Sequence, residues 1–130
     1  MTKKEQRKRI ETVVRRLGIS GTYQGLECLV RGVALVLAQP WMVCAVTKEL
    51  YPAIAREVGG TWRTVERNLR TVTAACWTWG DRGFLNEIAG FPLRERPTNG
   101  ELIDYLAHYI RVNGILEDEA GKKATEEEAE

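Results

Sequence analysis

Residues 51–79 of this chain are YPAIAREVGGTWRTVERNLRTVTAACWTW, a helical pattern interrupted once by Gly59-Gly60. Before the glycines, apolar residues recur as they do on one face of an α-helix. After them Thr61, a good N-cap, begins a second and longer helix that extends to about Trp79. Two helices joined by a short glycine turn are typical of the helix-turn-helix motif. The pattern therefore predicts an all-α fold that contains a helix-turn-helix.

The second helix of this motif separates an apolar face from a basic face. Counting about 100° per residue from Val65, four further side chains fall within about 40° of it: Leu69, Val72, Cys76 and Trp79. By the same count Arg63, Arg67 and Arg70 fall at about 140–200°, opposite the expected core. Three arginines are therefore expected to project from one helix face. An ordinary solvated helix has the same spacing, so periodicity alone leaves both interpretations open.

Residue types on this outward face suit the major groove of DNA. The N-terminal turns of a recognition helix enter the groove, where arginine donates two hydrogen bonds to guanine O6 and N7. A glutamate beside them can accept from cytosine N4 or hold a neighbouring arginine, and threonines with free N–H groups of the first turn suit phosphate contacts. The candidate DNA-binding residues are Thr61, Arg63, Thr64, Glu66, Arg67 and Arg70.

Further helices are expected around this motif. A first amphipathic helix ends at Gly18, and residues 22–39 are apolar almost all round, which is typical of a central buried helix. A helix is expected over residues 47–58, where Pro52 indicates a bend or a helix start near Tyr51.

The C-terminal half is expected to add two more helices. A short helix or turn covers residues 83–90, and the last helix begins at Thr98, with Glu101 placed as in a capping box. About six helices in a chain of 130 residues with 44% hydrophobic content predict one compact domain, residues 1–116.

The two ends of the chain carry opposite charge although the whole chain is only +1. Residues 1–16 hold seven Lys and Arg against two acids, and residues 117–130 hold two Lys against seven acids. Such asymmetry is a hint of nucleic-acid contact at the basic end, where the first helix is a further candidate for phosphate contacts. Residues 117–130 are expected to form an acidic disordered tail.

Sequence features of an enzyme are missing. There is no paired nucleophile and base, no glycine-rich phosphate loop and no metal-ligand cluster, so no catalytic activity, cofactor or metal is expected. Cys28, Cys44 and Cys76 lie in apolar helical stretches and are expected to be reduced core residues. No apolar run approaches the ~20 residues of a membrane span and no signal-like segment follows the basic N-terminus, so we expect a cytoplasmic protein.

Four separate blocks occur in one order along the chain: ELYPAIA at 49–55, VERNLR at 65–70, ACW at 75–77 before Gly80, and PTNGE at 97–101. On these blocks the region from about Ile10 to Val112 resembles the C-terminal effector domain of stage zero sporulation protein A. That protein is the response regulator that controls sporulation in endospore-forming bacteria. The resemblance implies a six-helix DNA-binding domain whose recognition helix reads a short box, often bound by two copies in tandem.

The resemblance can be carried over to individual positions. Glu66, Arg67 and Arg70 match recognition-helix residues of the family, while Arg63 and Thr64 stand where the family has polar or basic residues near the DNA backbone. In the family, the region that corresponds to residues 80–89 lies near a contact with a sigma factor of RNA polymerase, so a sigma factor is a candidate partner. These residues match the family less closely than the four blocks do. The family's regulator carries a phosphorylatable receiver domain ahead of this region, and no segment of the 130-residue sequence resembles such a domain.

A protein-interaction module is the alternative function. In that interpretation the helix-turn-helix scaffold binds another regulator rather than DNA. Four tryptophans supply the apolar surface for such a contact: Trp41, Trp62, Trp77 and Trp79. Most of them are expected to be core residues, and Trp62, at the start of the recognition helix, is the one expected to be exposed.

Overall fold

The computed structural model describes residues 1–19 and 24–117. Within these residues the chain forms six α-helices and two short helical turns, and no β-strand. The elements are α1 (Lys3–Arg15), α2 (Gln24–Ala38), the 3₁₀ turn η1 (Pro40–Cys44), the π-helical turn η2 (Val46–Leu50), α3 (Tyr51–Val58), α4 (Trp62–Trp79), α5 (Arg82–Ala89) and α6 (Asn99–Val112). The predicted all-α class is confirmed. The predicted disordered tail lies, from residue 118 on, outside the described residues.

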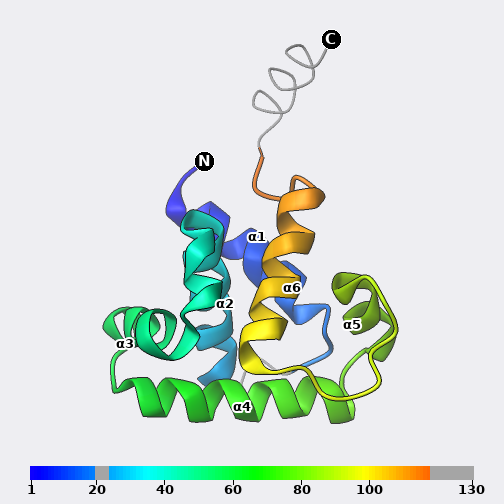
Figure 1. The fold of residues 1–130 in the computed structure, drawn as a ribbon. Coiled ribbons are helices and arrows are strands. Elements are labelled where there is room, and N and C mark those ends of the chain that lie inside the picture. The colour runs from blue at the N-terminus through cyan, green and yellow to red at the C-terminus, as the bar shows by residue number, and fades with distance from the viewer. Residues whose placement is uncertain (20–23, 118–130) are drawn as a thin grey trace.

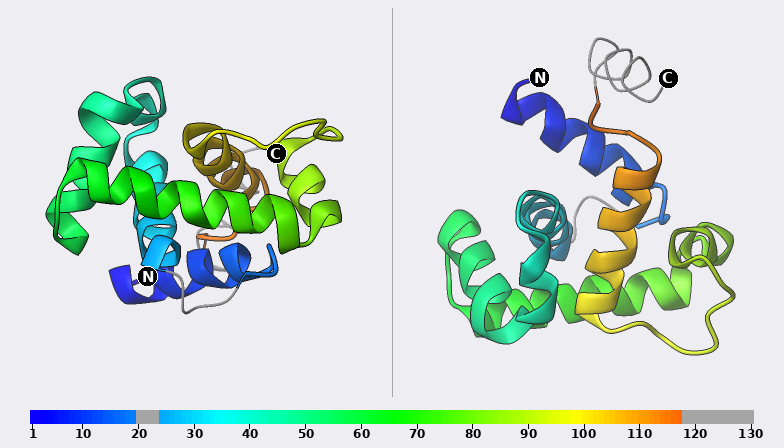
Figure 2. Two further views of the ribbon diagram at one scale, coloured as in Figure 1. Left: turned by 90° about the horizontal axis from the view of Figure 1, so that it is seen from below. Right: turned by 45° about the horizontal axis from the view of Figure 1, so that its top comes forward.

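The central helix is α2, as predicted, although its described part begins only at Gln24. It packs against α1, α3, α4 and α6, and eight of its 15 residues are buried. Figure 1 shows α2 and α6 standing on α4, which runs across one end of the domain. The view from below in Figure 2 shows the long outer side of α4 uncovered by any other helix. The core therefore lies on one side of α4 only.

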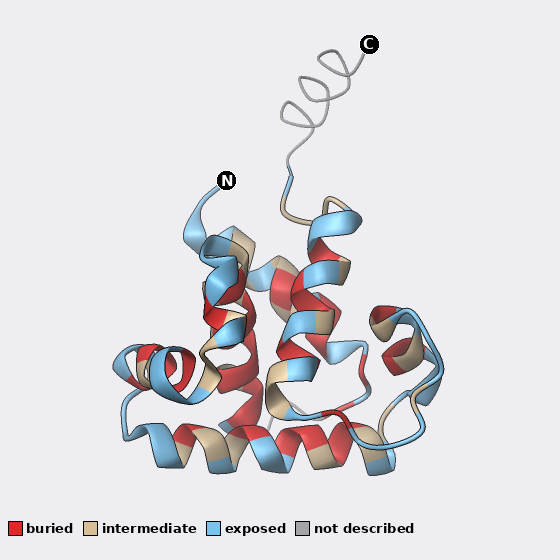
Figure 3. Cartoon of the chain, viewed as in Figure 1, coloured by how far each residue is buried: buried red, intermediate tan, exposed pale blue. Residues whose placement is uncertain are grey.

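The apolar face of α4 is buried as its periodicity predicted. Val65, Leu69, Val72 and Cys76 are each at most 1% exposed. Figure 3 shows the buried residues of α4 on the side that faces the other helices. Trp79 was expected on the same face, and this is wrong: it is 80% exposed. Trp79 is the last residue of α4, where the helix has run past the core that covers its earlier turns.

The turn between α3 and α4 requires its two glycines. Gly59 and Gly60 have φ angles of +91° and +87°, a region that side chains with a Cβ rarely adopt. Before α3, the π-helical turn η2 leads into the helix, which begins at Tyr51 with Pro52 in its first turn. The helix start near Tyr51 that Pro52 indicated is confirmed.

Side-chain caps fix the starts of the later helices. Thr61 Oγ1 accepts a hydrogen bond from the backbone N–H of Thr64 at the start of α4. At α6, the backbone N–H of Glu101 donates to Thr98 Oγ1 (3.0 Å) and that of Thr98 donates to the Glu101 carboxylate (2.9 Å). The predicted capping box is therefore present, and Glu101 is held by it.

Two of the three cysteines lie in the core. Cys28 and Cys76 are buried, and burial raises the pKa of both thiols, that of Cys76 to about 12. Cys44 was expected to be a core residue too, and this is wrong because it is exposed. It lies at the end of the 3₁₀ turn η1, a five-residue element of which only Met42 is buried. An apolar run in the sequence therefore did not form a buried helix there.

Candidate nucleic-acid interface

The uncovered side of α4 carries the three predicted arginines. Arg63, Arg67 and Arg70 are all exposed and lie within the first nine residues of the helix. The second half of the same face holds no charge, since its exposed residues are Thr71, Thr78 and Trp79. The basic surface is therefore limited to the N-terminal half of α4, the part of a recognition helix that enters the major groove.

Neighbouring side chains orient the arginines to different degrees. Arg70 forms an ion pair with Glu66 one turn earlier in the helix, and the Arg63 guanidinium lies over the Trp62 ring, 5.3 Å from its centroid. Among the described residues Arg67 takes part in no ion pair. A guanidinium without an ion-pair partner keeps both edges for an external acceptor. Arg67 is therefore the arginine of this face best prepared for a new bidentate contact.

The first turn of α4 presents hydroxyl and backbone donors. Thr61 and Thr64 lie close together, with 3.2 Å between their Oγ1 atoms, and the Thr61 oxygen accepts from the Thr64 N–H (3.3 Å). Helix geometry leaves the other N–H groups of this turn without intrahelical partners. Such a turn attracts anions through its N–H groups and through the positive end of the helix dipole. The two threonines thus lie where a DNA phosphate would approach.

A partly buried hydrogen-bond network joins α4 to α3 and α6, and no local sequence pattern indicated it. Asn99 donates through Nδ2 to the Tyr51 hydroxyl (3.1 Å) and to the Glu66 backbone carbonyl (3.3 Å), and its Oδ1 accepts from Thr73 Oγ1 (2.9 Å). Burial raises the pKa of Tyr51, so its hydroxyl is protonated at neutral pH. One side chain of α6 therefore fixes the angle at which α3 and α4 meet.

A further arginine that sequence reasoning missed lies beside this network. Arg96, in the loop before α6, is exposed and lines a shallow cleft of about 260 Å³ together with Arg70, Glu66 and Asn99. The sequence shows Arg94 and Arg96 in one short loop, with Glu95 between them, but no local pattern places this loop beside α4. With Arg96 the interface holds four arginines against one glutamate. It is a local basic surface on a chain of net charge +1.

The basic N-terminal helix is not part of this surface. Figure 1 shows the first turn of α1 at the end of the domain remote from α4, and the tilted view in Figure 2 agrees. α1 packs on α2 and α6 instead. The expectation that α1 shares phosphate contacts with α4 therefore gains no support from the arrangement.

The tryptophans are arranged differently from the prediction. Trp62 is exposed as expected (37%), but the expectation that most of the others are core residues is wrong, because Trp41 is 52% and Trp79 80% exposed. Contact with Arg63 accounts for part of the coverage of Trp62. Trp77 is half-buried and lies under the Arg82 guanidinium, 3.3 Å from the ring centroid. The two most exposed tryptophans lie on separate elements, η1 and the end of α4.

Residues 1–19 and 24–117 contain neither a metal-binding cluster nor a membrane-spanning helix. No group of three or more His, Cys, Asp or Glu side chains in these residues is arranged to hold a metal ion. In the same part of the chain no helix combines the length and hydropathy needed to cross a membrane.

A comparison with protein families gives a match over most of the chain. The family model described as "Sporulation initiation factor Spo0A C terminal" matches residues 10–110. The matched region runs from the middle of α1 to the end of α6 and includes the helix-turn-helix and Asn99.

Proposed function

The chain belongs to the Spo0A C-terminal family of DNA-binding effector domains, and on this premise we propose that its helix α4 reads double-stranded DNA in the major groove. The family membership confirms the resemblance drawn from the sequence blocks. The observation that carries the groove assignment is the outer side of α4, where Arg63, Arg67 and Arg70 are exposed opposite a fully buried face.

The contacts of the three arginines suggest which of them binds a base edge and which binds a phosphate. Arg67 lies in the second turn of α4 without an ion-pair partner among the described residues, so we assign it to a guanine edge. Arg70 lies about one turn beyond Arg67 and pairs with Glu66. It is assigned to a phosphate. Arg63 is pre-oriented by the Trp62 ring, and it is assigned to a base or a phosphate at the start of the helix.

The first turn would hold the DNA backbone. Thr61 and Thr64 are assigned to one phosphate, together with the free N–H groups of their turn. Such contacts fix the register of the helix on the duplex but carry no sequence information. Glu66 supports Arg70 and is within reach of a cytosine N4 donor if that ion pair opens.

We extend the proposal to partners on the basis of the family. Two copies are expected to bind in tandem on neighbouring boxes, and α5, residues 82–89, is a candidate surface for a sigma factor of RNA polymerase. Binding of chromosomal DNA would place the protein in the cytoplasm. Analytical ultracentrifugation with duplexes that hold one or two boxes would test the tandem arrangement, since cooperative loading is expected only on the second duplex.

The proposal is tested by selecting bound sites from a random duplex pool. A single enriched box that is lost with a triple Arg63→Ala, Arg67→Ala, Arg70→Ala variant supports it, provided that the variant melts like the parent. The protein-interaction alternative has one observation in its favour, the exposed Trp79 at the end of α4. No enrichment by the parent protein, or only salt-insensitive retention, would favour that alternative.

A further inference from the structure

A second basic surface lies at the opposite end of the domain, in a groove between α1 and α2. The α1–α2 groove has a volume of about 450 Å³. Its basic rim is formed by Lys3, Lys4, Arg7 and Arg31, and its apolar floor includes Ile10 and Leu35. Among the described residues Glu57 is the one acid that lines it. The lining residues therefore carry a net charge of about +3 beside an apolar floor, which fits an acidic segment with small apolar residues.

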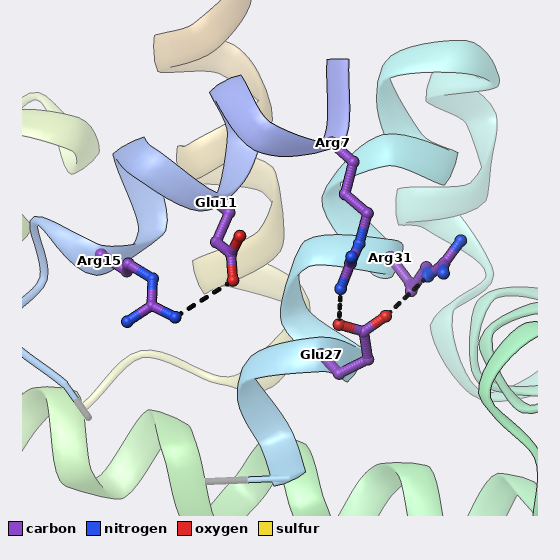
Figure 4. Close-up of polar contacts among 5 residues, drawn as sticks. All are labelled: Arg7, Glu11, Arg15, Glu27 and Arg31. Carbon is purple, nitrogen blue, oxygen red and sulfur yellow. Dashed lines mark hydrogen bonds and ion pairs between the residues drawn. The ribbon is translucent and has the colours of Figure 1, made fainter. Parts of the chain in front are cut away.

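Charge pairing of the basic groove residues is incomplete. Glu27 on α2 accepts from both Arg7 and Arg31 (Figure 4), so one carboxylate is shared by two guanidinium groups. Glu11, the acid of α1 drawn there, pairs with Arg15 instead. Among the described residues Lys3 and Lys4 take part in no ion pair. Two lysines and the free edges of two arginines are thus left for an acidic partner.

The last described residues of the chain contact α1. Arg9 on α1 donates to the backbone carbonyls of Ile115 and Glu117, both at 3.1 Å. Glu117 is the last described residue, and residues 118–130 beyond it hold six acids and two lysines, a net charge of −4. Glu117, the residue before the acidic segment, therefore lies in contact with α1.

We propose that residues 118–130 dock in the α1–α2 groove of their own chain, with their carboxylates on the lysine and arginine rim. Arg9 and Lys3 are about 9 Å apart along α1 at 1.5 Å per residue. The cluster Glu126-Glu127-Glu128 lies about ten residues beyond Glu117, and chain statistics for ten residues give an end-to-end distance of roughly 15–20 Å. A linker of this length gives the tethered acids a local concentration of the order of millimolar.

The position of the groove favours the tail over DNA as its occupant. The groove is lined mainly by the first turns of α1 and the second half of α2. Figure 1 shows these parts of the two helices at the end of the domain remote from α4, whose outer side is the proposed DNA interface. DNA held by α4 therefore leaves the groove open, whereas residues 118–130 follow Glu117, which contacts Arg9 on α1 just outside the groove lining. Docking would neutralise this second basic surface and confine polyanion binding to α4.

Spin-label NMR on the full chain without DNA tests the proposal, so that its outcome does not depend on the proposed DNA-binding function. Thr125→Cys carries the label in a Cys44→Ser background, since Cys44 is exposed and the other two cysteines are buried. We expect the strongest broadening at the amides of residues 3–7 and 31–38, and its loss in about 1 M salt, where the Debye length falls to about 3 Å.

Matched charge variants identify the rim. Lys3→Gln with Lys4→Gln should reduce the broadening at least twofold, whereas Lys8→Gln should leave it unchanged, because Lys8 lies on the same helix but does not line the groove. Broadening confined to residues 112–117, or equal effects of the two variants, would overturn the proposal. So would broadening that appears only when labelled and unlabelled copies are mixed, since the occupant would then be a second copy.

Discussion

Substitution of Gly25 by alanine should destabilise the domain and displace the recognition helix. Gly25 lies in the first turn of α2, where a Cβ would stand 2.2 Å from the carbonyl oxygen of Asn68 and 2.9 Å from Cβ of Val72, both on α4. Ordinary contact begins near 3.4 Å, so the two helices would have to separate by about 1.2 Å at this point. A backbone oxygen cannot rotate away as a flexible side chain can.

The magnitude follows from the cost of overpacking. Such insertions typically cost about 1–3 kcal/mol, which corresponds to a fall in Tm of about 4–12 °C for a domain of this size. Helix propensity alone predicts the opposite sign, because alanine is favoured over glycine in a helix by about 0.5–1 kcal/mol. The assay is a thermal melt followed by circular dichroism, with DNA affinity measured on the same samples.

Gly83 is the matched control for Gly25. It also lies in the first turn of a helix, α5, but a Cβ there would meet only the Asp81 carboxylate, at 3.4 Å. Gly83→Ala should therefore melt at or slightly above the parent. If Gly25→Ala also melts at or above the parent, the close approach of α2 to α4 is refuted.

Three further outcomes are expected. If three to four arginines release counterions from phosphates, affinity for DNA should fall roughly 40- to 150-fold between 50 and 200 mM salt, and a flat response would argue against the interface. A thiol reagent at pH 8 should modify Cys44 rapidly and the buried Cys28 and Cys76 only on unfolding. Rapid modification of two thiols in the native state would contradict the burial of Cys28 and Cys76. Leu69→Ala should lose about 2–5 kcal/mol of stability in denaturant melts with the choice of DNA box unchanged, and a shifted box would place Leu69 at the interface instead.

Local signals in the sequence were sufficient for most of the helices. Threonine caps at Thr61 and Thr98 and the glycine pair at 59–60 depend on residues within one turn of each other, and all appear in the structure as predicted. The inward face of α4 was predicted because helical periodicity converts sequence spacing directly into direction. The prediction failed at Trp79, because helical periodicity gives the direction of a side chain but not the point along α4 where the packed core ends.

Features that depend on contacts between distant segments could not be predicted. The Asn99 network joins Tyr51, Glu66 and Thr73 over separations of up to 48 residues, which no local pattern encodes. Arg96 reaches the interface only because the loop before α6 returns to α4. Exposure of Cys44 results from a 3₁₀ turn inside an apolar run, where composition favoured a buried helix.

The most direct test of the recognition-helix assignment is the affinity of Arg67→Ala for the selected box and for its single-base variants, measured beside the parent and Arg70→Ala. Both arginines are exposed, so both variants should melt like the parent. Loss of a bidentate base contact should cost Arg67→Ala about 1–3 kcal/mol on the preferred box and relax the choice of base at one position. Arg70→Ala should weaken all sequences more evenly and lower the salt slope by about one. If Arg67→Ala melts like the parent and still prefers the same box by the same factor, α4 does not read DNA through this residue and the assignment is wrong.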